Sequence, residues 1–270
     1  STKWNSRGEA VARLSSADRE AVADQRRKVE AERAARARKV ERETQRIWAS
    51  AKPCSSHPYL ADKRVPSYGL RVDAGELLIP VSDMSGHLRA RQAIAADGTK
   101  LWPYGTDRST ALQFTIGDLK ASVAVIVVVE GYATGATIHE ATGLPVVVAF
   151  DAAGLKRIAA LLRVAFPDAV LIFAGDNDAS GTGQKAARDA AAEVGGLAFC
   201  PPIKGTDWND HAHGKRDKAG AIVCKPHGLD DVHDRFRALL SPHQVEAGLP
   251  IDQARDRLQV LMHEAVEALM

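Results

Sequence analysis

Six acidic residues share one feature, because each follows a short apolar run of the kind that forms buried β-strands. They are Glu130 after AVIVVV, Asp151 after PVVVAF, Asp176 and Asp178 after AVLIFAG, and Asp207 and Asp210 after LAFC. In a parallel sheet the carboxyl ends of the strands meet at one edge, which is where open α/β sheets bind their ligands. We therefore expect these carboxylates to line one crevice.

Carboxylates packed this closely repel each other unless a cation lies between them or one of them takes up a proton. No paired Cys or His stands near them. Ligand sets made only of oxygen favour hard ions, so the expected cofactor is Mg²⁺ or Mn²⁺. Clustered carboxylates with hard cations are typical of phosphoryl transfer, in which the metal orients and polarises phosphate oxygens.

Each acidic residue also has a structural alternative. A lone Asp-x-Asp is common in turns, where Asp bonds to its own backbone. Glu130 can be a helix-start carboxylate favoured by the helix dipole, and Asp151 can be a helix cap. The order of the signals favours a site: a strand followed by Glu and Gly, then a strand followed by Asp-x-Asp, Gly and a helix. Gly131 is expected to let the backbone turn away from Glu130 without a β-carbon clash.

The elements that must position these residues alternate along the chain. Between 121 and 201, apolar runs alternate with helical stretches such as YATGATIHEAT and GTGQKAARDAAAEVG, which predicts a parallel sheet with helices on both faces. Upstream, the runs ELLIPV, HLRARQAIA and LQFTIG are separated by turn sequences and predict a small antiparallel β-rich module. Two further helical patterns, DDVHDRFRALL and PIDQARDRLQVLMHEAVEALM, follow Asp217.

A long helix is predicted over 16–51, which lacks Gly and Pro and opens with the capping-type sequence SSADRE. Its apolar stripe is thin: Val22, Val29, Val40 and Ile47. From 26 to 46 it carries nine Lys/Arg against four Glu, so it is either a solvated helix docked along one seam or a basic arm along a phosphate backbone. The expected segments are a basic helical part (1–52), a β-rich module (53–120), a catalytic α/β domain (121–216) and a helical carboxyl-terminal part (217–270).

Composition indicates an ordinary soluble protein, with 45% hydrophobic and 26% charged residues and a net charge of +2. Cys54, Cys200 and Cys224 form no Cys-x-x-Cys, which argues against a zinc ribbon or a disulfide framework and fits a reducing cytosol. No apolar run reaches the ~18 residues that span a bilayer. We expect a cytoplasmic protein with no membrane partner.

The segments EGYATGATIHEATG, PVVVAFDAAGL, GDNDASGTGQKAA and DWND together resemble the Toprim domain, which bacterial-type DNA primases, topoisomerases and some nucleases share. With HPYLADKRV and GELLIPVSDMSGHLRARQAIAADGTK upstream, the chain is similar to Toprim primases of plasmids, integrative elements and phages over about 49–210. The resemblance implies that Glu130, Asp176 and Asp178 are catalytic and hold metal with Asp207. Asp151 and Asp210 would support them. The family's separate zinc-binding module has no counterpart in the cysteine spacing.

Four basic residues are candidates for binding nucleotide or DNA. Arg89 and Arg91 lie on one face of a strand because side chains alternate with period two, and Lys100 follows the turn that returns the chain beside them. The resemblance implies that these three line a groove for template and nucleotide. Lys185 stands near the start of the helix after Asp178, where a phosphate can bind. For each of them, a solvated surface position is the structural alternative.

The resemblance implies a nucleotidyltransferase: a DNA-directed primase that makes short primers from nucleoside triphosphates on a single-stranded DNA template. A helicase or a zinc-binding module elsewhere in the native protein would be a partner. One alternative is a Toprim nuclease that uses water as the nucleophile. Such nucleases tend to accompany an ATPase, and GxxxxGK[ST] does not occur in this chain. The other is a non-catalytic single-stranded-DNA-binding module, against which the presence of every acidic position argues.

Overall fold

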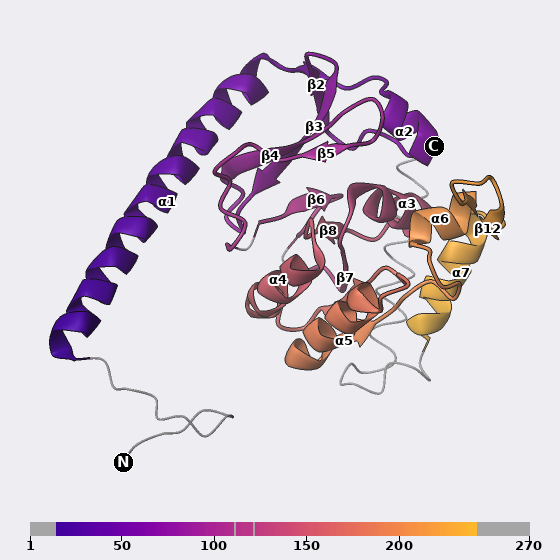
Figure 1. Cartoon of the computed structure of the whole chain (residues 1–270). Coiled ribbons are helices and arrows are strands. Elements are labelled where there is room, and N and C mark those ends of the chain that lie inside the picture. Colours follow the sequence, from indigo (N-terminus) through magenta and orange to yellow (C-terminus); the bar gives the residue numbers. More distant parts are fainter. Residues whose placement is uncertain (1–14, 111, 121, 242–270) are drawn as a thin grey trace.

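The computed structural model describes residues 15–110, 112–120 and 122–241 (Figure 1). Its elements form two five-stranded sheets, one small hairpin and helices that cover the parallel sheet. The described helices are α1 (Ser16–Ser50), α2 (Pro58–Lys63), α3 (Tyr132–Thr142), α4 (Ala152–Ala165), α5 (Thr182–Val194), α6 (Trp208–His213) and α7 (Leu229–Leu239).

The first sheet is antiparallel and confirms the predicted β-rich module. Its five strands follow one another in space as they do in sequence: β1 (Lys52–Pro53), β2 (Arg71–Asp73), β3 (Glu76–Ser82), β4 (Leu88–Ile94) and β5 (Lys100–Leu101). The longest pairing joins β3 to β4, with Leu78 opposite Ala93 and Pro80 opposite Arg91. The turn before β5 brings Lys100 opposite Ile94, so the return of the chain beside β4 is as predicted.

The second sheet contains the predicted parallel core. Its order is β10 (Leu197–Ala198), β9 (Val170–Ala174), β7 (Val125–Val129), β8 (Val146–Val148) and β6 (Phe114–Ile116), and the first four strands are parallel. The prediction for β6 was wrong: this strand, the middle of LQFTIG, pairs antiparallel with β8 instead of belonging to the β-rich module. All three residues of β8 are fully buried valines, and an apolar edge of that kind needs a partner.

Side-chain alternation along β7 explains the two faces of the core. Ile126 and Val128 pack under α4 and α5, in a cluster with Leu155, Ile158 and Ala187. The alternate residues of β7 face a second cluster that contains side chains from α3, α6 and α7 and from β3 and β4. The two sheets therefore share one core, which fixes the β-rich module above the carboxyl edge of the parallel sheet (Figure 1). Truncating one of these buried residues to Ala typically costs about 2–5 kcal/mol of stability.

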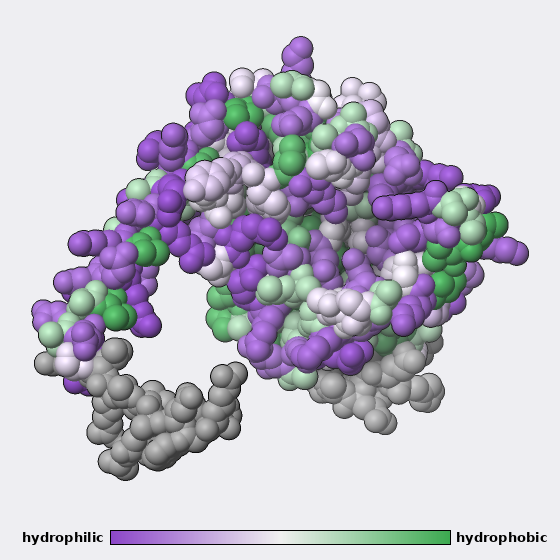
Figure 2. All heavy atoms as spheres, viewed as in Figure 1, coloured by the Kyte–Doolittle hydropathy of each residue, from purple (hydrophilic) through white to green (hydrophobic). Residues whose placement is uncertain are grey.

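Only half of α1 packs on the molecule. Its capping box at Ser15 and Asp18 confirms the predicted start. Val40 is 7% exposed and packs near β4, whereas Val22 and Val29 are 41% and 50% exposed. Figure 2 shows α1 as a mostly hydrophilic rod with isolated hydrophobic spots. The predicted seam is confirmed for the second half of the helix, and the first half projects away from the body (Figure 1).

After α6 the chain forms a hairpin that the sequence did not predict, β11 (Lys215–Arg216) and β12 (Ile222–Cys224), followed by α7. Helix α7 is the first of the two predicted carboxyl-terminal helices. The second, PIDQARDRLQVLMHEAVEALM, lies outside the described residues. None of the described helices is long and apolar enough to cross a membrane.

Candidate active site

Two acidic residues lie at adjacent strand ends, as predicted. Strands β7 and β9 are parallel with Val129 opposite Ala174, so Glu130 and Asp176 leave the same edge of the sheet side by side. Glu130 Oε1 and Asp176 Oδ1 are buried and accept no hydrogen bond from any residue that the structure describes. A buried carboxylate oxygen without a donor is costly. Two such oxygens at one edge are therefore suited to a cation.

Burial and neighbouring negative charges shift the pKa values of the carboxylates at this edge. Burial, and then the negative charges of Asp207 and Glu130, raise the pKa of Asp176 to about 7. Burial also raises the pKa of Glu130, and the charges of Asp178 and Asp151 add to this effect. Burial and mutual repulsion therefore outweigh the charge of Lys100, which lowers the pKa of both residues. We call Glu130, Asp176 and Asp207 the acidic cluster.

The donor set of the acidic cluster is all oxygen, which fits Mg²⁺ or Mn²⁺. No three carboxylates among the described residues have their oxygens all within 4.8 Å of one another.

Asp178 behaves differently from the acidic cluster. Its carboxylate accepts hydrogen bonds from the backbone N–H groups of Ser180 (2.8 Å) and Gly183 (2.6 Å), and from the Ser180 hydroxyl. The Ser180 hydroxyl, followed by the Gly183 N–H, lowers the pKa of Asp178 to about 2. Asp178 thus organises the turn into α5, as its structural alternative predicted. The Thr182 N–H also donates to it at 3.3 Å, so Oδ1 accepts three hydrogen bonds and Oδ2 accepts one, and a metal-binding role for Asp178 stays a prediction.

Two glycines near Glu130 have different roles. A β-carbon on Gly183 would lie 2.5 Å from the carbonyl oxygen of Asp176 and 3.0 Å from Glu130 Oε1, so only glycine lets α5 start against the acidic cluster. At Gly131 the backbone is extended (φ −124°), and the nearest atom to such a β-carbon would be Lys100 Nζ at 3.7 Å. The predicted clash at Gly131 was wrong, because an ordinary residue fits the backbone there.

The other predicted acids are helix caps with hydrogen-bonded charges. Asp151 caps α4, accepts from the Gly154 N–H at 2.6 Å and pairs with Arg157 (3.0 Å) and Arg108, which confirms its structural alternative. Asp207 and Asp210 form a capping box at α6. Burial and then the charge of Asp210 raise the pKa of Asp207.

Asp210 is balanced by a cation, because its Oδ2 accepts from Lys215 Nζ at 2.7 Å. Asp210 is 7% exposed, whereas the Lys215 side chain is 38% exposed, so the pair is half-buried beside Asp207. The charges of both Asp207 and Asp210 raise the pKa of Asp176, and Asp207 has the larger effect.

Of the four basic candidates, Lys100 reaches the acidic cluster. Although the side chain as a whole is exposed, its ammonium group lies among protein atoms, and this desolvation lowers the pKa of Lys100. The charges of Asp207 and Asp176 oppose that shift. Lys100 is therefore a cation held beside unbalanced carboxylates, which suits a residue that contacts phosphate.

The other three basic candidates face elsewhere. Arg89 pairs with Asp83 (2.8 Å) and Glu41 (3.0 Å) on the α1 side of the sheet. Arg91 also lies towards α1, because its charge acts on Glu43 of that helix. The hydrogen bond from Arg46 lowers the pKa of Glu43 most, and the charge of Arg91 lowers it further. Lys185 pairs with Asp189 on the exposed face of α5. Their roles in binding stay predictions, and only Lys100 is beside the acidic cluster.

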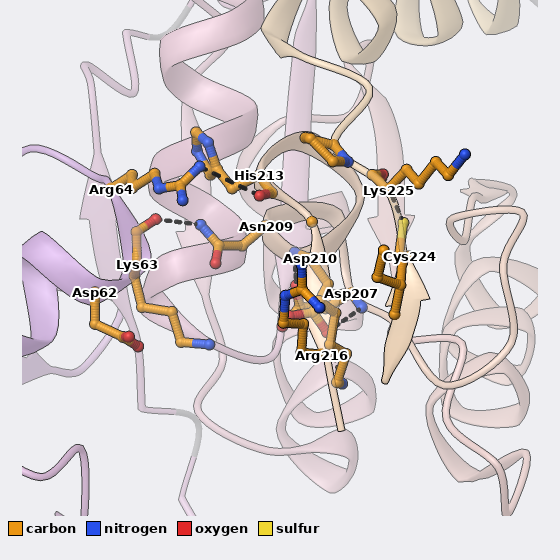
Figure 3. A pocket seen from close by; sticks show the side chains of 14 residues that line it. Asp62, Lys63, Arg64, Asp207, Asn209, Asp210, His213, Arg216, Cys224 and Lys225 are labelled. Carbon is orange, nitrogen blue, oxygen red and sulfur yellow. Dashed lines mark hydrogen bonds and ion pairs between the residues drawn. The ribbon is translucent and has the colours of Figure 1, made fainter. Parts of the chain in front are cut away.

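A cavity of about 640 Å³ adjoins the site and was not predicted (Figure 3). It lies between the end of α2, helix α6 and the β11–β12 hairpin, and Asp207 and Asp210 form part of its wall. Five basic residues line it: Lys63, Arg64, Lys215, Arg216 and Lys225. Four of these residues stand in the segments ADKR and HGKR. The sequence does not predict the pocket, because α2 and the hairpin meet only in the folded chain. We call this cavity the basic pocket.

Comparison with known proteins agrees with this geometry. Residues 125–217 match the Toprim domain family, and this segment includes Glu130, Asp176 and Asp207. The chain is 31% identical over 258 residues to a DNA primase TraC of Escherichia coli, covering 83% of this chain and 24% of that protein. It is 32% identical over 214 residues to a second protein of that name and organism, covering 73% of this chain and 15% of that one. The chain thus spans about a quarter or less of each relative.

Solved structures with a similar arrangement include the primase fragment of the bacteriophage T7 primase-helicase protein. It is 20% identical with a TM-score of 0.45, covering 56% of this chain and 67% of that one. Another is the DnaG primase catalytic domain bound to single-stranded DNA, 18% identical with a TM-score of 0.37, covering 75% of this chain and 69% of that one.

Proposed function

We propose that this Toprim-domain chain, a relative of DNA primases, is the catalytic core of a metal-dependent primase. It would act in the cytoplasm and make short primers from nucleoside triphosphates on single-stranded DNA during replication or transfer of a plasmid, mobile element or phage. A helicase or a zinc-binding module elsewhere in a longer protein would be its partner.

The observation that carries the proposal is the pair of buried, unpartnered oxygens, Glu130 Oε1 and Asp176 Oδ1. A fold that only needed a strand end would give these carboxylates hydrogen-bond donors, as it gives them to Asp151 and Asp178. Leaving buried oxygens without a hydrogen-bond donor destabilises the protein. Their presence in a Toprim segment supports a role in holding ions for phosphoryl transfer.

Bound Mg²⁺ or Mn²⁺ would hold the triphosphate and stabilise the charge that develops during transfer. Asp176 and Asp207 would be ligands of the ion, and Glu130 would either be a third ligand or take the proton of the attacking 3′-hydroxyl at Oε1. Burial raises the pKa of Glu130, which makes its carboxylate a better proton acceptor than an exposed one. Lys100 and the basic pocket would bind the phosphates of the nucleotide through their positive charge.

The single-stranded template would lie across the β-rich module and α1. The packed half of α1 and strand β4 together carry a basic surface, and α1 is largely hydrophilic (Figure 2). Contacts of this kind are made to phosphates and carry no sequence information. Selection of a start site would then depend on other parts of the protein.

The test is incorporation of labelled nucleoside triphosphates on single-stranded DNA, with and without Mg²⁺ or Mn²⁺. We expect metal-dependent incorporation by the wild type and by Asp189→Asn, a matched control on the exposed face of α5. We expect none from Asp176→Asn. Loss of activity in the control alone, or activity in Asp176→Asn equal to that of the wild type, contradicts the proposal.

The same assay separates the alternatives. Metal-dependent shortening of the template, without incorporation, would identify a nuclease that uses water at the same carboxylates. Salt-sensitive binding of DNA with neither reaction would identify a binding module.

A further inference from the structure

A second group of potential metal ligands lies behind the basic pocket, away from the strand ends. His211 of α6, Cys224 at the end of β12 and His227 in the turn before α7 each offer a ligand atom, and these atoms all lie within 4.8 Å of one another. His211 is fully buried and Cys224 is 3% exposed, whereas His227 is exposed. Among the described residues, no other three His, Cys, Asp or Glu side chains come this close.

The imidazole of His211 is already oriented for a ligand. Its Nε2 lies 2.7 Å from Asp231 Oδ2, and this carboxylate also accepts from Arg235. An acceptor at Nε2 places the proton there and leaves a lone pair on Nδ1. Nδ1 is buried and has no partner among the described residues. A carboxylate that fixes a histidine through one nitrogen while the other faces an ion is the usual outer support of a metal site.

Cys224 supplies a soft donor on an open wall. Its thiol donates a weak hydrogen bond to the Lys225 carbonyl at 3.1 Å, and the residue forms part of the wall of the basic pocket (Figure 3). The run Cys224-Lys225-Pro226-His227 places a cysteine and a histidine three positions apart, a spacing within the range of zinc ligands. The backbone of His227 is fixed on α6, because its N–H donates to the His211 carbonyl at 3.1 Å.

One side chain must move for all three ligands to meet an ion. The rings of His211 and His227 are stacked, with centroids 4.3 Å apart and planes 6° apart. Lone pairs of parallel rings cannot point at one ion, so His227 must rotate out of the stack, which its exposed position allows. Zn–S and Zn–N bonds of about 2.3 and 2.0 Å also require the ligand atoms to approach one another to within about 3.3–3.8 Å.

We propose that His211 Nδ1, Cys224 Sγ and His227 bind one Zn²⁺ ion, with the fourth position open towards the basic pocket. A set of two nitrogens and one sulfur favours zinc over Mg²⁺ or Mn²⁺, so this site differs in chemistry from the acidic cluster. The ion would clamp the β11–β12 hairpin and the start of α7 onto α6. Because Asp207 caps the other end of α6, the clamp would hold one wall of the active site in place.

A purely structural account is the rival explanation. In it, the His211–Asp231 pair only joins α6 to α7, and Cys224 is a buried apolar residue. That account predicts no thiolate ligand and no effect of His227, which is exposed and makes no side-chain hydrogen bond within the described residues.

The test uses the whole chain, freed of metal with a chelator and titrated with Co²⁺ as a spectroscopic substitute for Zn²⁺. We expect one equivalent to give a thiolate-to-cobalt charge-transfer band that Zn²⁺ displaces. Cys224→Ser should abolish the band, and His227→Gln should weaken binding at least tenfold. Asp231→Asn should weaken it about 10–100-fold, the usual effect of losing an outer support. Cys200→Ser and His233→Gln are the controls and should bind as the wild type does.

Absence of the band in the wild type, or an unchanged band in Cys224→Ser, overturns the proposal. If Cys224→Ser does not fold, the exposed variant His227→Gln decides, with circular dichroism to confirm its fold. Binding by His227→Gln equal to that of the wild type then counts against the site. Asp176→Asn should keep the band, because the acidic cluster has no sulfur. Failure of the zinc site and failure of the proposed primase activity are therefore distinguishable.

Discussion

Carboxylates at the strand ends and at the helix starts of this molecule differ in whether their oxygens accept hydrogen bonds. At the strand ends, Glu130 and Asp176 are half-buried, and each has one buried oxygen that no described donor satisfies. At the helix starts, Asp151 and Asp178 accept two or more hydrogen bonds each. A mutation that removes a hydrogen-bonded carboxylate lowers the stability of the protein. A buried carboxylate oxygen without a donor lowers stability by being present. The difference indicates which acids the fold needs and which it holds for another purpose.

The largest expected effect is a loss of activity without a loss of stability when Asp176 is replaced. Asp176→Asn should cut nucleotide incorporation at least a hundredfold, because the ion contributes several kcal/mol and each ~1.4 kcal/mol is a factor of ten. Without metal, its midpoint of urea unfolding should equal or exceed that of the wild type. A clear drop in stability would show that Asp176 is structural.

Glu130→Gln should also lower incorporation by more than tenfold. It tests a different role, so Mg²⁺ affinity has to be measured beside it. If Glu130 is a direct ligand, affinity and activity fall together; if it accepts a proton, affinity changes less than in Asp176→Asn. Wild-type incorporation by Glu130→Gln contradicts both roles.

Asp178→Asn tests a residue that has a structural role and for which a metal-binding role is also predicted. The amide keeps one oxygen for the Gly183 and Ser180 donors, so the fold should persist with a loss of about 1 kcal/mol, as for a weakened cap. If Asp178 is also a ligand, incorporation falls by orders of magnitude. Near-wild-type synthesis by the Asp176/Asp178 double variant would end the primase account.

The pH dependence of stability follows from Asp176. Its pKa in the folded protein, about 7, lies above the ordinary value of 3.8, so the folded state holds a proton that the unfolded state releases. Stability without metal should therefore fall as the pH rises from about 4 to about 7, and then level off. Urea unfolding at several pH values measures this. Asp176→Asn should flatten the curve, and so should Mg²⁺, which replaces the proton.

The smallest expected effects concern the basic residues. Binding of single-stranded DNA should weaken with salt by about 0.7 in log–log slope for each phosphate contacted. Arg91→Ala should lower affinity and reduce the slope by one such contact if Arg91 contacts a phosphate. Fluorescence anisotropy over a salt series provides both values. An unchanged slope in the Arg89/Arg91 double variant would mean that these residues serve only the packing of α1.

The sequence predicted the parallel core well, because strands such as Val125–Val129 are apolar throughout and are bounded by helices. It failed at β6, whose partner is β8 and not its neighbours in sequence. The short β11–β12 hairpin has too few residues for any periodicity. Pairing of distant edges is a property of the folded chain, so local patterns do not contain it.

For the site, the sequence predicted that Glu130 and Asp176 leave adjacent strand ends, but not how each acid is satisfied. The sequence DNDASG is compatible with Asp178 as a turn residue and with Asp178 as a metal ligand. The hydrogen bonds from Ser180 and Gly183, which show its structural role, are visible only in the structure. The three proposed zinc ligands, His211, Cys224 and His227, which we call the His211 group, were not predicted from the sequence. They come from α6, β12 and the segment before α7, which meet only in the folded chain. Half of that signal, the run CKPH, was present in the sequence.

The central claim is that Glu130 and Asp176 stay unsatisfied in order to hold a divalent ion. The most direct measurement is Mn²⁺ binding by electron paramagnetic resonance, made in the Cys224→Ser background so that the His211 group does not contribute. The account predicts that Asp176→Asn weakens Mn²⁺ binding at least tenfold, while Asp189→Asn leaves it unchanged. Equal Mn²⁺ affinity in Asp176→Asn and its background would contradict it.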